Sequence, residues 1–279
     1  MMTRLHRRTV DLLTLHAILI VLTAAVMLPV AFMFFGSFKP LPEIFRSPPR
    51  LFPVAPTIQN YIDAARSAPF GIFIWNSVYV GILTTLGAIV VAIPAAYSFS
   101  HIKPWGGKFV FMLILSGMMI PPQATIIPRY FIIQNLGWIN TYQALVVPFL
   151  ARPIGIFLLY QFFRTVPKDF EDSARIDGCG PFRYMARILV PLSRPAIGAL
   201  AILTFVESWN RYMWPLIIAT TRRMQTAPIG IRTFIVGSEG SYFGMMMAGA
   251  VIVIFPAIMI FILGQKQFVG ALARGGIKG

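Results

Sequence analysis

The chain has 279 residues, of which 57% are hydrophobic and 12% are charged, and its mean hydropathy is +0.74. Soluble globular domains do not have this composition, so we expect the chain to lie in a bilayer. Its formal net charge is +15. Nucleic-acid binding is nevertheless not predicted, because the basic residues lie between apolar runs instead of forming a stripe on a soluble domain.

Six segments are apolar over about 20 residues or more, the length that a helix needs to cross the hydrocarbon core of a membrane. They are residues 12–36, 72–100, 109–128, 142–163, 195–219 and 244–265. The first follows basic residues as a secretory signal does, but its apolar run is too long for a signal and no cleavage site is obvious. The sequence therefore predicts an all-α, polytopic membrane protein with six transmembrane helices in one transmembrane domain, residues 1–279.

The Lys and Arg residues are divided unevenly between the two sides that six spans would define. Fourteen of them fall in the 63 positions of one set of loops, residues 1–10, 101–108, 164–194 and 266–279. Eight fall in the 71 positions of the other set, residues 37–70, 129–141 and 220–243. Because loops rich in Lys and Arg stay in the cytoplasm, we expect the N- and C-termini to be cytoplasmic.

The loop between the fourth and fifth segments, residues 164–194 and hereafter the polar loop, concentrates the acidic residues. Four of the nine in the chain fall within nine positions of it: Asp169, Glu171, Asp172 and Asp177. Pro167 suits the first turn of a helix and Gly178 the end of one. We therefore expect a short helix over residues 167–177 and a second helix from Pro181.

Each of these two helices carries an apolar stripe. The residues are Val166, Phe170 and Ala174 in the first, and Phe182, Met185, Ala186 and Leu189 in the second. Such a helix pair either lies on lipid headgroups or docks onto a partner. Four carboxylates fit an anionic leaflet poorly, so the pattern favours docking onto a soluble cytoplasmic protein.

Spaced residues in the polar loop match a known pattern. Asp172-Ser173-Ala174 is followed after three residues by Gly178, after nine more by Ile188, and then by Val190-Pro191. This spacing resembles the cytoplasmic loop of bacterial ATP-binding-cassette (ABC) importer permeases, in which Glu-Ala-Ala, Gly, Ile and Leu-Pro stand at these intervals. Asp for Glu, Ser for Ala and Val for Leu are the departures.

The resemblance extends over more than half of the chain. It includes LGWINT (136–141), WNRYMWPL (209–216), MQTAPIGI (224–231) and the tail QKQFVGALARGGIKG (265–279). These motifs are similar to the carbohydrate-uptake branch of the importers, and within it to the second permease subunit of the maltose type.

The resemblance implies a permease subunit of the bacterial inner membrane that forms half of a translocation pathway. Its partners would be a second homologous permease, two cytoplasmic ATPase subunits that bind ATP and Mg, and an external solute-binding protein. Segment 166–191 would couple this chain to the ATPase through Phe170, Glu171, Asp172, Ser173, Ala174, Asp177, Gly178, Ile188 and Pro191. Of these, Phe170 and Ala174 are expected to be buried in a groove of the ATPase.

No catalytic centre is predicted in this chain. The segment nearest to a phosphate-binding loop, Gly106-Gly107-Lys108-Phe109, lacks the leading glycine and the hydroxyl that holds magnesium. The three histidines (His6, His16 and His101) and the single Cys179 form no metal-ligand motif. We therefore expect no cofactor and no metal here, and ATP hydrolysis by separate subunits.

The fifth segment contains ionisable residues, which cost about 2.5–3.5 kcal/mol each at the centre of a spanning helix and so usually face a pathway or a partner. The candidate substrate-pathway residues are Glu207, Trp209, Asn210, Arg211, Tyr212 and Trp214. The aromatic faces would stack on a sugar, while Asn210 and the charged pair would bond its hydroxyls. Alternatively, Glu207 and Arg211 only neutralise each other, and the tryptophans are interfacial anchors.

The sequence leaves three functions open. The first is the ABC importer permease for a carbohydrate or related polar solute. The second is a permease of the same kind for an anionic solute, such as glycerol 3-phosphate or an acidic sugar. The third is an ion-coupled secondary transporter in which Glu207 carries a proton, although no internal repeat of the kind common in such transporters is visible. A membrane-embedded enzyme is disfavoured, because paired catalytic groups are missing from the sequence.

Overall fold

The structure is a computed structural model that describes residues 2–234 and 242–276, with side chains described over 12–234 and 242–262. Every regular element in these ranges is helical. The prediction of an all-α fold is therefore confirmed. The chain divides into two compact units, Met1–Pro69 with Ile231–Ile254, and Phe70–Gly230 with Phe255–Gly279.

The first unit contains α1 (Met2–Gly36), α2 (Leu41–Ile44), α3 (Gln59–Ser67), η7 (Ile231–Phe234) and the start of α15 (Phe243–Gly276). The apolar side chains of α1 from Leu12 to Leu28 are exposed, as expected for a helix that faces lipid. At the end of α1 the side-chain amide of Asn60 donates to the carbonyls of Ser37 and Lys39 at 2.9 and 2.8 Å. These bonds join α3 to the segment that follows α1.

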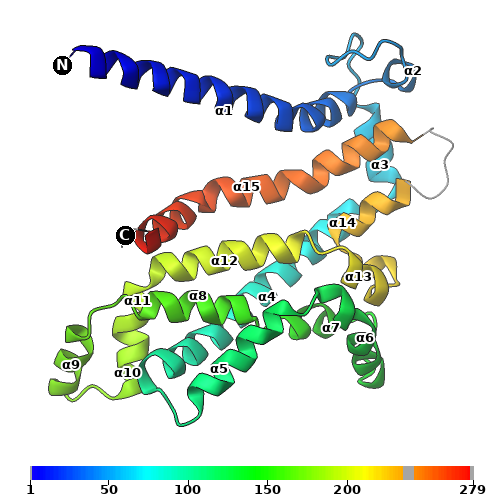
Figure 1. The fold of residues 1–279 in the computed structure, drawn as a ribbon. Helices are drawn as coiled ribbons and strands as arrows, with labels where there is room; N and C mark the ends of the chain where they lie inside the picture. The colour runs from blue at the N-terminus through cyan, green and yellow to red at the C-terminus, as the bar shows by residue number, and fades with distance from the viewer. Residues whose placement is uncertain (1, 235–241, 277–279) are drawn as a thin grey trace. The chain divides into compact units, whose positions relative to one another are not determined.

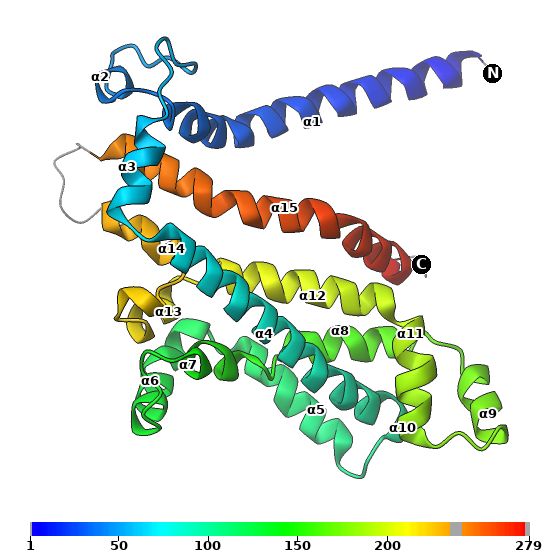
Figure 2. The same cartoon turned by 180° about the vertical axis from the view of Figure 1, so that it is seen from behind.

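The second unit is built around α4 (Phe70–Tyr97), which a π-helical turn, η1 (Ser98–Ile102), continues. Helices α8 (Pro153–Phe163) and α12 (Arg194–Trp209) pack against α4, which lies behind them in Figure 1 and in front of them in Figure 2. Small residues allow α8 and α12 to lie close to each other. A Cβ on Gly155 would lie 3.0 Å from Leu200 Cδ1. Close packing through small residues is what holds membrane helices together.

The predicted span 109–128 is not one straight helix. Helix α5 (Gly107–Ser116) passes into η2 (Gly117–Met119) and stops, and the chain resumes as η3 (Pro122–Thr125) and α6 (Ile126–Asn135) after a bend of 99°. The cause is Pro121-Pro122. Neither residue has an N–H to donate, and both Ile120 and Pro121 have extended ψ angles of 118° and 132°.

The predicted spans 142–163 and 195–219 are also interrupted. The first is α7 (Tyr142–Val146) with η4 (Val147–Phe149), followed by α8 after a bend of 43°. In the second, α12 ends at Trp209 and a short α13 (Met213–Ile218) follows. Beyond it lie η6 (Arg222–Met224) and α14 (Ala227–Gly230).

Three helical segments are long and apolar enough to cross a membrane, namely Leu12–Gly36, Phe70–Ile102 and Phe243–Ile262. Three bent pairs have the composition of a span when taken together: Gly107–Met119 with Pro122–Asn135, Tyr142–Phe149 with Pro153–Phe163, and Pro181–Leu192 with Arg194–Trp209. By length and composition the described residues therefore contain three candidate spans, or up to six if each bent pair is one span.

Candidate functional site

The first candidate site is the polar loop, which contains α9 (Asp169–Ile176), α10 (Pro181–Tyr184), η5 (Met185–Leu189) and α11 (Val190–Leu192). Helix α9 has Asp169, Glu171 and Asp172 in its first turn, where carboxylates interact favourably with the helix dipole. Gly178 ends it with a φ of +71°, while Cys179 N donates to Ala174 O at 2.8 Å. This is the glycine-ended cap that the sequence predicts.

One side of α9 is held by the chain itself. Ala174 is buried in the core that α4, α8 and α12 form. Glu171 accepts a bond from Arg175 at 2.6 Å, and its other oxygen lies 3.9 Å from His101 Nε2 in η1. The expectation that Ala174 is buried in a partner's groove is therefore wrong. Its methyl group already packs against this chain, and Glu171 lies near His101 at the end of the helix that α4 begins.

Three large apolar side chains of the polar loop are exposed. The exposed fractions are 46% for Phe170, 87% for Ile176 and 76% for Phe182. Asp172, Ser173 and Asp177 are exposed beside them, whereas Ile188 and Pro191 are half-buried. We define the docking face as Phe170, Asp172, Ile176, Asp177 and Phe182. Ile176 was missed in the sequence because it falls outside the stripe at four-residue spacing.

The stripe predicted for the second helix of the loop is only partly right. Met185 and Leu189 are buried, but Phe182 and Ala186 are exposed. The reason is that residues 185–189 form a π-helical turn, which widens the helix and changes which positions share a face.

The second candidate site is the arginine cluster, defined as Arg129 (α6), Arg152 (just before α8), Glu207 (α12) and Arg211 (after α12). Glu207 pairs with Arg152 through one carboxylate oxygen, and its other oxygen lies 3.9 Å from Arg211 Nη2. The guanidinium carbon of Arg211 lies 3.4 Å from the ring centroid of Phe149, and that of Arg129 lies 4.9 Å from the same centroid. Two cations therefore share one aromatic ring.

The proximity of Glu207 and Arg211 agrees with their four-residue spacing, whereas Arg129 and Arg152 are members of the cluster that the sequence did not predict. Arg152 stands inside the predicted span 142–163, so the rule that an ionisable residue in a span is functional would have found it. Arg129 is the first residue of the predicted loop 129–141, where a basic residue indicates only a loop charge. Its place in the cluster depends on the bend at Pro121-Pro122.

The two tryptophans predicted to stack on a sugar are buried. Trp209 is 1% exposed and lies against the ring of Phe205, and Trp214 is 3% exposed and donates its indole N–H to Ala144 O at 2.9 Å. The expectation that these rings face a solute is therefore wrong for this conformation, and they are not interfacial anchors. Asn210 and Tyr212 are exposed, so they stay candidates.

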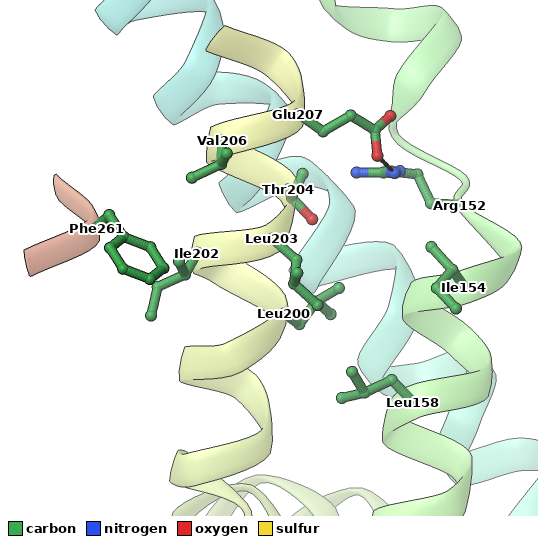
Figure 3. Close-up of a pocket in the computed structure, with 10 residues that line it drawn as sticks. All are labelled: Arg152, Ile154, Leu158, Leu200, Ile202, Leu203, Thr204, Val206, Glu207 and Phe261. Atoms are coloured by element: carbon green, nitrogen blue, oxygen red, sulfur yellow. Dashed lines mark hydrogen bonds and ion pairs between the residues drawn. The ribbon is translucent and has the colours of Figure 1, made fainter. Parts of the chain in front are cut away.

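A cavity of about 360 Å³ adjoins the arginine cluster within the second unit. Figure 3 shows Arg152 and Glu207 pointing toward each other at one end of it, while its other walls are mainly aliphatic side chains of α8 and α12 with Phe261 of α15. The charged end provides polar contacts, and the long walls provide few. This cavity therefore does not offer the rows of polar groups that sugar hydroxyls need.

The motifs LGWINT and MQTAPIGI have structural roles. Asn140 has a φ of +60°, and its side chain bonds Thr220 Oγ1 at 2.7 Å and accepts from Thr221 N at 3.0 Å. The buried Asn76 of α4 donates to the carbonyls of Arg223 and Gln225 at 2.8 and 2.9 Å. These bonds fix the segment after α13 to α4 and to the loop before α7.

Within the described residues no three His, Cys, Asp or Glu side chains gather closely enough to hold a metal ion. The expectation that this chain holds no metal and no cofactor stays a prediction.

An all-helical chain with long apolar helices and several bent pairs of spanning composition is a polytopic membrane protein. Residues 88–269 match the family described as "Binding-protein-dependent transport system inner membrane component". The chain belongs to this family and is a permease component of an ABC importer. The family resemblance seen in the sequence motifs is confirmed.

Relatives match almost the whole chain. It is 33% identical to the sn-glycerol-3-phosphate transport system permease protein UgpE of Brucella abortus (strain 2308), over 97% of this chain and 99% of the relative. It is 33% identical to the arabinooligosaccharides transport system permease protein AraQ of Bacillus subtilis (strain 168), over 90% of each. A crystal structure of a bacterial ABC transporter involved in the import of the acidic polysaccharide alginate contains a chain with the same fold. The comparison of this chain with that chain gives a TM-score of 0.83 at 19% sequence identity, and it covers 93% of this chain and 97% of the importer chain.

Proposed function

We propose that this chain forms half of the pathway by which a carbohydrate or related polar solute crosses the bacterial inner membrane. A second, homologous permease supplies the other half. An external binding protein delivers the solute, and two cytoplasmic ATPase subunits bind ATP and Mg and hydrolyse the ATP. The solute classes in the names of the relatives, an oligosaccharide and a phosphorylated polyol, support this choice.

The observation that carries the coupling role is that the polar loop packs against this chain through Ala174 and still exposes large apolar side chains. Its docking face exposes Phe170, Ile176 and Phe182, and such large side chains gain most when a partner buries them. The loop also packs against the core of the second unit through Ala174 of α9. A partner that moves α9 therefore moves the end of α4 as well. Asp172 and Asp177 give the face a negative charge that a basic groove would complement.

The occupant that we assign to the docking face is the ATPase, with both termini of this chain on the same, cytoplasmic side. Lipid is the other surface that an apolar loop could contact. The carboxylates of Asp169, Asp172 and Asp177 are exposed beside the apolar side chains, and they would be repelled by an anionic leaflet.

The test is co-purification of the ATPase with variants of the docking face. In Phe170→Asp and Ile176→Asp we expect the amount of ATPase retained to fall by about tenfold or more, because a charge enters an apolar contact and remains unpaired. The amount of permease in the membrane should stay at the wild-type level, because both side chains are exposed. Solute uptake should fall in parallel.

The matched control is Val54→Asp, which places the same charge at an exposed apolar position of a loop predicted to lie on the other side of the membrane. This variant should retain the ATPase fully. Wild-type retention in both docking-face variants would refute the assignment of this face to the ATPase.

A further inference from the structure

The arginine cluster contains more positive charge than its single carboxylate neutralises. Three guanidinium groups and one carboxylate meet there, which leaves a formal surplus of two positive charges. Such a surplus inside a membrane protein is costly unless the charges face water or a ligand. The cluster therefore raises the question of which anion balances it.

Arg129 has no carboxylate partner among the described residues. Its guanidinium donates to Thr125 Oγ1 at 3.1 Å and otherwise lies over two aromatic rings, Phe149 at 4.9 Å and Trp214 at 5.3 Å. Rings hold a guanidinium in place through their faces and leave its N–H groups free at the edge. Arg129 is thus oriented, but its charge is not neutralised.

Arg211 is in a similar state. Its side chain is 11% exposed, and Nη2 is buried with no hydrogen-bond partner within the described part of the chain. The nearest carboxylate oxygen, Glu207 Oε1, is 3.9 Å away, which is too long for a hydrogen bond. Glu207 is bound more closely by Arg152. A buried guanidinium nitrogen without a partner is a donor that a ligand oxygen would satisfy.

We propose that Arg129 and Arg211, held on the ring of Phe149, bind the anionic group of the transported solute, a phosphate or a carboxylate. This inference rests on the proposed function and narrows its solute class to anionic polyols or sugars. Guanidinium groups suit phosphate and carboxylate oxygens because their N–H donors match the spacing of the acceptors. Glu207, through its contact with Arg211, is the internal counter-ion that the solute replaces.

The same chemistry would attract the phosphate of an anionic lipid, so the experiment includes both sources. The probe is radiolabelled sn-glycerol 3-phosphate, and its equilibrium binding is measured by scintillation proximity on the complete transporter without the external binding protein. The transporter is held in nanodiscs of phosphatidylcholine or of phosphatidylglycerol. Glucuronate, glycerol and glucose serve as competitors.

We expect saturable binding that glucuronate displaces and that neutral glycerol and glucose do not. Arg129→Gln and Arg211→Gln should each weaken binding by about tenfold or more, the loss expected for one charge-assisted hydrogen bond. Arg129→Lys should restore part of the affinity, because it keeps the charge without the guanidinium geometry. The matched control is Arg164→Gln, which removes another arginine that lies over a ring, that of Tyr160, and it should bind normally.

Four results would overturn the proposal. They are the absence of saturable binding, equal displacement by the neutral competitors, unchanged affinity in both Gln variants, and loss of wild-type binding in phosphatidylglycerol, which would assign the site to lipid. ATP-driven uptake of a neutral sugar that the Gln variants leave intact would also refute it, while leaving the proposed permease function in place.

Discussion

Glu207 pairs with one arginine and lies near a second, and this arrangement decides what a substitution at Glu207 does. Its carboxylate pairs with Arg152, which is 55 positions away in the chain, and lies near Arg211. The four-residue spacing of Glu207 and Arg211 in the sequence indicates the second contact, but nothing local in the sequence indicates the first. Residue-level prediction therefore identified the right carboxylate and gave it an incomplete set of partners.

We predict that Glu207→Gln lowers the thermal stability of the assembled transporter more than Arg152→Gln does. Loss of the carboxylate leaves three arginines without an anion, whereas loss of Arg152 leaves Glu207 near Arg211. The cost should be about 1–2 kcal/mol, below the 3–5 kcal/mol typical of fully buried pairs, because the Glu207 side chain is 54% exposed. Thermal unfolding in nanodiscs measures the difference.

The same variant has a binding consequence. Because Glu207 competes with the solute for Arg211, Glu207→Gln should bind sn-glycerol 3-phosphate more tightly than the wild type. A variant that is equally stable and has unchanged affinity would show that Glu207 is not the counter-ion of this cluster.

At the scale of helices, hydropathy predicted the positions of the apolar segments well. It did not predict which of these segments are straight helices and which are bent. Predicted spans 12–36 and 72–100 are long helices, but 109–128 bends by 99° after η2. The prolines that cause the break, Pro121 and Pro122, were visible in the sequence. Their consequence was not predictable, because a proline in a spanning helix either kinks it slightly or ends it, depending on the neighbouring helices.

The packing of α8 on α12 gives a prediction for this scale. Gly155→Val should destabilise the second unit by about 1–3 kcal/mol, since even a Cβ would lie 3.0 Å from Leu200 Cδ1 and 3.8 Å from the Ala92 Cβ of α4. The expected signs are a lower thermal midpoint and less permease in the membrane.

The matched control is Gly180→Val in the polar loop. A Cβ there meets no atom within 4 Å, and the φ of −68° suits any residue. This variant should unfold like the wild type. If Gly155→Val did the same, the close approach of α8 and α12 would not contribute to stability.

For the whole molecule, the sequence motifs were sufficient for the family and for the position of the polar loop. They were not sufficient for deciding which side chains in these segments are accessible. Ala174, Trp209 and Trp214 had the right types for contacts with a partner or a sugar, but all three are buried in the second unit. Burial depends on which distant helices pack together, and this information is absent from a local motif.

The driving force of transport would come from a partner of this chain. The chain would supply the pathway and the docking face, and hydrolysis in the ATPase would move α9 and with it the end of α4. A secondary transporter would instead need only this chain and an ion gradient, with Glu207 as the proton carrier. In the structure Glu207 pairs with Arg152, so its carboxylate already has a cationic partner within this chain.

The most direct measurement is uptake by proteoliposomes of the labelled ligand of the cognate external binding protein, with and without trapped ATP. We expect uptake only when both permeases, the ATPase, the binding protein and ATP are present, with no response to a proton gradient. Uptake by this chain alone, driven by a proton gradient and lost in Glu207→Gln, would contradict the account.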